Sequence, residues 1–317
     1  MPINADKPLQ WNEDIRASVD QFNQWFMVFA PKAFREARLK TTEDVEKSLR
    51  LTKDLTAIGA ATIAANPQIL PTLRMATCPP LARDRLVGLA YTTKNLVYKM
   101  EEGAVPLRIA PATLQEHLGR ISDIISKLLD RDIFPWLAAN TTPTKAERHR
   151  ASTIVADRLC GAVSDPIVRN AQEQRQLALI QSFLEGRGYR FLQHPQSADL
   201  TTMEPGTFSF RLNVRVGEEP SFVNIPVDVV IQSKRAKKNE LPLFVEAKSA
   251  GDFTNVNKRR KEEAAKMRQL RATYGTGVRY ILFLCGYFDT GYLGYEAAEG
   301  MDWVWEHRID DLAKFRI

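Results

Sequence analysis

Cysteine, histidine and long apolar stretches are all scarce in this chain of 317 residues. The three cysteines stand far apart, so they indicate neither a zinc knuckle nor a disulfide framework. Three of the four histidines, His117, His149 and His194, lack the spacing of metal ligands and of a catalytic triad. No apolar run reaches membrane-spanning length, and the first residues lack the apolar core of a signal peptide. We therefore expect a cytoplasmic protein.

Positive charge is in modest excess. The net charge is +6, with 26% charged and 44% hydrophobic residues. A basic balance is consistent with a polyanionic partner such as DNA, although many mildly basic proteins bind no nucleic acid. The chain is long enough for two domains, each with its own core.

Helical spacing of apolar residues dominates the first half of the chain, from about Trp11 to Asp132. Thr41 and the acids after it indicate a helix start, and further helices are expected over 81–100 and 110–129. A polar, proline-containing stretch then follows at 140–150. We predict a helical domain over 1–145, serving as a DNA clasp or in dimerisation, and a second domain over 146–317.

The second half alternates helix and strand signals. A basic turn of a few residues between two strands makes them antiparallel, and a helical crossover places the next strand parallel. The fold class expected is α + α/β, with a helical N-terminal domain followed by a central mixed β-sheet flanked by helices. The elements expected are a helix over 165–186, strands over 207–216, 222–231 and 243–248, a helix over 256–274 and a strand over 278–286.

Three charged side chains converge where two of these strands pair. Glu246 and Lys248 are two residues apart and so leave the sheet on the same side. Asp228 lies in the neighbouring strand, where Val227, Val229 and Ile231 are expected to point to the opposite face. Burying three separate charges is costly, so a shared divalent metal is the simplest purpose.

The donor set fits magnesium, because Mg²⁺ prefers few protein oxygens and several waters. Asp228, Glu246 and the carbonyl of Ala247 would be its ligands. Carboxylates that hold one or two Mg²⁺ ions can support hydrolysis of a phosphodiester. Lys248 would orient the attacking water, or take its proton if the metal's charge lowers its pKa. The alternative is a surface strand with a Glu/Lys pair and Asp228 at a strand end.

The helix expected over 256–274 concentrates positive charge next to this site. A helix N-terminus flanked by Asn and Arg can hold phosphates and contact base edges in the major groove. A solvated charged face, to which Glu262 and Glu263 would belong, is the alternative. Its position directly after the Glu246 strand favours DNA binding by Asn255, Asn257, Lys258, Arg259, Arg260 and Lys261.

The pattern Pro226-Val-Asp228 with Glu246-Ala-Lys248 resembles the PD-(D/E)XK nuclease motif, with one residue inserted between Pro and Asp. Residues 170–312 resemble the XamI-type family of type II restriction endonucleases. The runs that carry the similarity begin Asn170-Ala-Gln-Glu-Gln-Arg-Gln, Val245-Glu-Ala-Lys-Ser-Ala-Gly-Asp, Leu284-Cys-Gly-Tyr-Phe-Asp and Gly294-Tyr-Glu-Ala-Ala-Glu-Gly.

This resemblance implies a PD-(D/E)XK nuclease core and Mg²⁺-dependent cleavage of double-stranded DNA at a short palindromic site. It places Asp228, Glu246 and Lys248 in the catalytic motif. It also makes Glu173 the helix glutamate that orients a metal-bound water. An exposed helix on which Glu173 merely pairs with Arg169 or other basic neighbours is an equally open alternative.

A palindromic site suits two symmetric active sites, so we expect a homodimer. A cognate DNA methyltransferase is expected in the same restriction-modification system. Two other functions remain open: a PD-(D/E)XK nuclease of DNA repair or recombination, and a non-catalytic DNA-binding protein. The clustered acids argue against the last, since a pure binder has no need of acids that face DNA.

Overall fold

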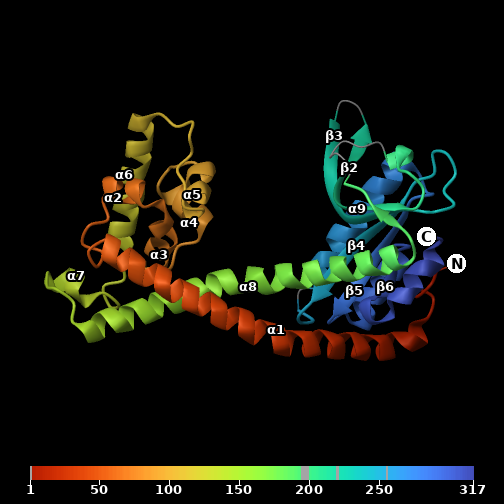
Figure 1. The fold of residues 1–317 in the computed structure, drawn as a ribbon, viewed down its shortest axis with the longest axis horizontal. Helices are drawn as coiled ribbons and strands as arrows, with labels where there is room; N and C mark the ends of the chain where they lie inside the picture. Colours follow the sequence, from red (N-terminus) through yellow and green to blue (C-terminus); the bar gives the residue numbers. More distant parts are fainter. Residues whose placement is uncertain (1, 194–199, 219–220, 255) are drawn as a thin grey trace. The chain divides into compact units, whose positions relative to one another are not determined.

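The computed structural model describes residues 2–193, 200–218, 221–254 and 256–317, and for residues 201, 218 and 256–260 the backbone alone. The chain forms two compact units, one of Met1–Phe29 with Arg169–Ile317 and one of Ala30–Val168 (Figure 1). Two long helices, α1 (Pro8–Leu51) and α8 (Lys145–Gly186), run from one unit into the other. The domain division between residues 145 and 146 stays a prediction.

The unit Ala30–Val168 is helical, which confirms the helical N-terminal region. Its core contains Leu118, Ile121 and Ile125, which recur at helical spacing on α6 and are fully buried. No described helix of the chain combines the length and the apolar character needed to cross a membrane. Besides parts of α1 and α8, the unit holds α2 (Ala60–Ala65), η1 (Pro67–Ile69), α3 (Leu70–Met75), α4 (Arg83–Leu89), α5 (Lys94–Glu101), α6 (Pro111–Leu128) and α7 (Pro135–Ala139).

Two local expectations for this unit are wrong. Thr41 does not start a helix, because its hydroxyl donates to the Arg38 carbonyl (3.1 Å) inside α1 instead of capping a new one. The helix expected over 81–100 is two helices, α4 and α5. The chain breaks between them at Tyr91, whose φ of 46° is left-handed and incompatible with a continuing right-handed helix.

The other unit is built on a six-stranded mixed sheet in the order β1 to β6. The β3–β4 pair is antiparallel and the β4–β5 pair is parallel, as the short turn and the helical crossover predict. The β2–β3 pair is also antiparallel, and the β5–β6 pair is parallel. The strands are β1 (Arg190–Phe191), β2 (Thr207–Glu218), β3 (Ser221–Gln232), β4 (Leu243–Ala250), β5 (Arg279–Gly286) and β6 (Asp302–Trp305).

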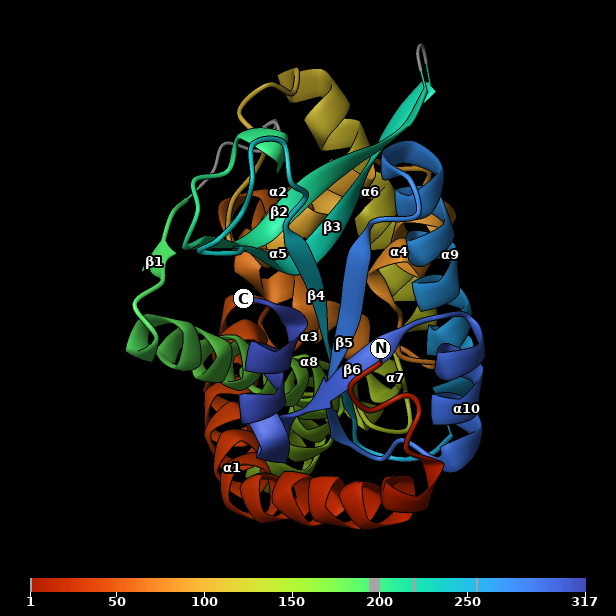
Figure 2. The same ribbon diagram turned by 90° about the vertical axis from the view of Figure 1, so that its right-hand side faces the viewer.

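Helices cover both faces of this sheet (Figure 2). The end of α8 packs on one face, where the short helix η3 (Glu306–Phe315) adds Leu312. On the opposite face lie α9 (Val256–Tyr274) and α10 (Thr290–Ala298). The α8 face buries Leu177, Ile180, Leu184, Val229, Val245 and Phe283, and the α9 face buries Phe244, Met267, Leu270, Leu282 and Leu293.

The hairpin of β2 and β3 changes faces along its length, which the alternating pattern does not predict. Phe208 and Val229 pack on the α8 face, whereas Leu212 and Val227 pack in the cluster with α9. Arg211, between them, has a left-handed φ of 51°, which rotates the chain out of the regular pleat. The expectation that Val227 shares a face with Val229 is therefore wrong.

Candidate active site

The strands β3 and β4 separate at two carboxylates. Their pairing covers only Val229–Ile231 against Leu243–Val245, so Asp228 and Glu246 flank the point of divergence. Asp228 is half-buried there, and its Oδ2 accepts a hydrogen bond from the backbone N–H of Ala247 at 2.8 Å. Antiparallel strands that separate leave backbone groups without a partner, and this bond satisfies one of them.

Glu246 is the centre of the charged group. Its residue is 4% exposed, and its Oε1 lies 3.0 Å from the Nζ of Lys248 and 2.6 Å from the Nζ of Lys266 on α9. Lys266 also donates to the carbonyl of Pro226 at 3.0 Å. The other oxygen, Oε2, is buried and has no hydrogen-bond partner among the described residues. The three residues predicted for the site therefore meet in the structure.

A further buried carboxylate, Glu263 of α9, joins this group. Its Oε1 lies 3.5 Å from the Nζ of Lys248, and its Oε2 accepts a hydrogen bond from the Tyr292 hydroxyl at 2.8 Å. Glu263 is fully buried, so the solvated face considered for it is wrong. The signal that was available is its spacing, since Glu263, Met267 and Leu270 fall on one helical stripe.

Burial and charge shift the pKa values of this group. Burial, together with the nearby Glu246, raises the pKa of Asp228 to about 6, while the Ala247 N–H and the lysines oppose the shift. Burial lowers the pKa of Lys248, but the carboxylates of Glu246 and Glu263 more than offset this and hold it above its ordinary value. Lys248 is therefore a charged donor here. Burial and Glu263 raise the pKa of Glu296 on α10 to about 9, so its carboxyl is neutral at pH 7.

Glu173 lies on α8 beside this region. Its Oε1 accepts a hydrogen bond from Arg211 at 2.7 Å. Arg211 lies between Phe210 and Leu212, which pair with the two neighbours of Asp228, Val229 and Val227, in the register of β2 and β3. Gln176, one helical turn further on, donates to the carbonyl of Lys248 at 3.3 Å. Glu173 is thus tied to the strand beside Asp228, and its role in orienting a water stays a prediction.

The residues predicted to bind DNA at the start of α9 fall largely outside the described residues. This holds for Asn255 as a whole and for the side chains of Asn257, Lys258, Arg259 and Arg260. Lys261 is described and exposed, as a DNA contact requires. Its binding of DNA stays a prediction.

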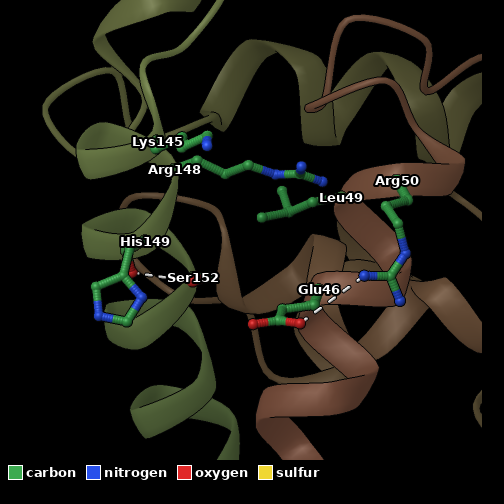
Figure 3. A pocket seen from close by; sticks show the side chains of 7 residues that line it. All are labelled: Glu46, Leu49, Arg50, Lys145, Arg148, His149 and Ser152. Atoms are coloured by element: carbon green, nitrogen blue, oxygen red, sulfur yellow. Dashed lines mark hydrogen bonds and ion pairs between the residues drawn. The ribbon is translucent and has the colours of Figure 1, made fainter.

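A hollow of about 220 Å³ in the helical unit is separate from this group (Figure 3). Both arginines that line it have acidic partners, because Arg148 pairs with Asp54 at 2.9 Å and Arg50 with Glu46 at 3.8 Å. None of the predicted site residues lines it. The lining residues are Glu46, Leu49, Arg50, Lys145, Arg148, His149 and Ser152.

Comparison with known proteins places the chain in a family. The model of the XamI restriction endonuclease family matches residues 53–305. The type II restriction enzyme SalI of Streptomyces albus G is 55% identical over 310 residues, which cover 98% of each chain. The crystal structure of protein VC1899 from Vibrio cholerae aligns with 90% of this chain and 55% of its own at 12% identity. Its TM-score of 0.29 is too low to carry an argument. This chain belongs to the XamI restriction endonuclease family and is a type II site-specific deoxyribonuclease.

Proposed function

We propose that Asp228, Glu246 and Lys248 form the DNA-cutting centre of this restriction endonuclease, with Mg²⁺ as the cofactor. The observation that carries the proposal is the pair of carboxylates at the divergence of β3 and β4, with the Lys248 ammonium 3.0 Å from Glu246. Hydrolysis of a phosphodiester needs negative ligands for a metal and positive charge for the phosphate, and both are present.

The donor atoms suit a hard divalent cation. Among the described residues no group of three or more His, Cys, Asp and Glu could hold a metal ion, so the proposed set relies on two carboxylates and one backbone carbonyl. Mg²⁺ accepts such a set, since it usually keeps several waters. The buried Oε2 of Glu246 has no hydrogen-bond partner among the described residues. A buried carboxylate oxygen of this kind is available as a ligand for a cation. Asp228, Glu246 and the Ala247 carbonyl would hold the ion, which supplies charge stabilisation and an activated water.

The two lysines act on the phosphate. Lys248 is held by the carboxylates of both Glu246 and Glu263, which restricts the position of its ammonium group. A protonated Lys248 donates hydrogen bonds to the phosphate or to the attacking water, and does not take the proton. Lys266 adds a second positive charge 2.6 Å from Glu246, where charge develops on the phosphorane.

The finer features of fold and assembly belong to the same proposal. A mixed sheet with α8 and α9 on opposite faces supports a PD-(D/E)XK core, and Glu173 would orient the attacking water from α8. The helical domain over 1–145 would serve as a DNA clasp or in dimerisation. A homodimer fits a short palindromic site, because each protomer then cuts one strand. A cognate methyltransferase would protect the same site.

Digestion of plasmid DNA with Mg²⁺ tests this function. Discrete fragments are expected, and sequencing of their ends gives the recognition site and the stagger. The site should read the same on both strands, and the mass of the protein bound to one duplex should equal two chains. Intact plasmid, or a smear of random lengths, would contradict the proposal.

A further inference from the structure

Beyond the divergence point, β2 and β3 continue as a two-stranded ribbon. Within the described residues, β1 pairs with β2 only at Thr207 and Phe208, and β4 leaves β3 after Val229. The segments 212–218 and 221–227 thus pair only with each other among the described strands. Figure 2 shows this ribbon running on past β4 beside α9. An isolated hairpin is marginal in water, so its position depends on the helix behind it.

The inner face of the ribbon is fixed to α9. Leu212, Val214 and Val216 are buried in one cluster with residues of that helix. The backbone is tied as well, because the Tyr274 hydroxyl donates to the Arg215 carbonyl at 2.6 Å and the N–H of Gly217 donates to the hydroxyl of Thr273 at 2.9 Å. The ribbon is therefore a rigid support for whatever its other face carries.

The outer face carries hydrogen-bond donors and acceptors beside Pro226 and Phe222. Arg215 and Asn224 are paired across the two strands and exposed, and Asn213 is half-buried two register pairs nearer the site. The Arg215 guanidinium lies over the ring of Phe222 at 3.5 Å, which fixes its plane. Arg and Asn are the side chains whose paired donors and acceptors match guanine and adenine in the major groove.

The spacing along the ribbon matches a DNA target. The major groove is wide enough to admit a two-stranded β-ribbon. Asn224, which pairs with Arg215, stands four residues from Asp228 along β3. Four residues span about 13 Å along a strand, or about four base-pair steps. A duplex with its scissile phosphate at Asp228 would thus present nearby base pairs to these side chains.

We propose that the outer face of this ribbon enters the major groove of double-stranded DNA and recognises the base sequence, with Arg215 and Asn224 as the main base contacts and Asn213 beside them. The inference rests on the proposed DNA-cutting centre at Asp228, because that centre sets where the duplex lies. In this arrangement β2 and β3 recognise the base sequence, whereas the start of α9 would contact phosphates.

Binding measurements on two duplexes test this inference. One duplex carries the site mapped by sequencing the fragment ends, and the other has the same bases in shuffled order. Ca²⁺ replaces Mg²⁺, and the duplex is checked to stay intact. Arg215→Ala and Asn224→Ala should each weaken binding of the site duplex by about 5-fold to 150-fold and leave shuffled binding little changed. Arg235→Ala, which removes an exposed arginine from the β3–β4 turn, is the matched control and should keep the preference.

Base analogues combined with the Arg215 variants identify the base that Arg215 contacts. Each purine of the site is replaced in turn by its 7-deaza analogue, which lacks the N7 acceptor. Wild-type protein should lose affinity at the purines that Arg215 and Asn224 contact in each half-site, and the Arg215→Ala variant should lose nothing further at the purine that Arg215 contacts. Arg215→Lys keeps the charge but not the two-pronged donor, so it should lose the site preference and keep shuffled binding.

Two results would overturn the inference. One is a site preference in Arg215→Ala and Asn224→Ala equal to that of the wild type. The other is an equal loss on both duplexes, which would make the ribbon a phosphate contact. If the wild-type protein itself shows no preferred site and no cutting, the proposed function fails together with the ribbon. If the wild-type protein cuts at a specific site and the variants keep the same site preference, the proposed function stands and only the role of the ribbon in base recognition is wrong.

Discussion

Glu263 Oε1 lies 3.5 Å from the Nζ of Lys248, although the two residues belong to a helix and a strand separated along the chain. Glu263 is itself held by the Tyr292 hydroxyl, so α9 and α10 together fix a lysine of the sheet. The neutral carboxyl of Glu296 lies in the same buried group and adds no charge there at pH 7. Lys248 is thus positioned by a carboxylate of α9 as well as by Glu246 of its own strand.

Glu263→Gln should slow DNA cutting by about 10-fold to 100-fold, because the Lys248 ammonium loses one of the two carboxylates that direct it. The affinity for the site duplex should not change, since Glu263 is buried and cannot touch DNA. Single-turnover cutting and equilibrium binding separate the two effects. Glu262→Gln, the same substitution on the exposed neighbour, is the control and should cut at the wild-type rate. If Glu263→Gln cuts DNA at the wild-type rate, Glu263 does not position Lys248 for catalysis.

Asp228→Asn should stabilise the metal-free protein at pH 7.5. The folded pKa of about 6 exceeds the ordinary value of 3.8, so the native state binds this proton more tightly than the unfolded chain. Stability from this group is then fully present below about pH 4 and is lost as the pH rises through about 6. The variant should gain about 1–3 kcal/mol in urea unfolding at pH 7.5, and the gain should vanish near pH 4.

The exposed Asp20→Asn makes the same substitution on the surface and is the control for this stability measurement. Added Mg²⁺ should raise the melting temperature of the wild type more than that of Asp228→Asn, since a ligand of the native state stabilises it. If the Asp228→Asn variant is less stable than the wild type at pH 7.5 without metal, the assignment of a destabilising charge to this carboxylate is wrong.

Lys266→Met should raise the affinity for Mg²⁺ or Mn²⁺ roughly tenfold, because an ammonium 2.6 Å from Glu246 competes with a metal for the same oxygen. Calorimetric titration without DNA measures this directly. Cutting should nevertheless slow, since the positive charge near the phosphate is lost. The matched control, Lys261→Met on the exposed side of α9, should leave metal affinity unchanged. Equal or weaker metal binding by Lys266→Met would place the metal elsewhere.

The topology of the sheet followed from local features of the sequence. The turn after Gln232 is too short for anything but an antiparallel pair, and the crossover through α9 requires β5 to lie parallel to β4. The meeting of Asp228, Glu246 and Lys248 followed from that pairing and from the two-residue period of strands.

The partners on α9 could not be predicted in the same way. The spacing of Glu263 with Met267 and Leu270 indicates burial, but only the helix's rotation against the sheet shows that Glu263 meets Lys248 and that Lys266 meets Glu246. The change of faces at Arg211 was equally hidden, because alternation of apolar residues is the same before and after a single left-handed residue. Tertiary packing decides both features.

Cutting of the mapped site by Asp228→Ala, Glu246→Ala and Lys248→Ala, beside the wild type and Lys261→Ala, tests the central claim most directly. Each of the three variants should lose at least about 10²-fold to 10⁴-fold in single-turnover rate with Mg²⁺, while binding of the site duplex in Ca²⁺ stays close to wild type. Lys261→Ala should keep the catalytic rate even where it weakens binding. Wild-type cutting by any of the three variants would contradict the assignment of the DNA-cutting centre.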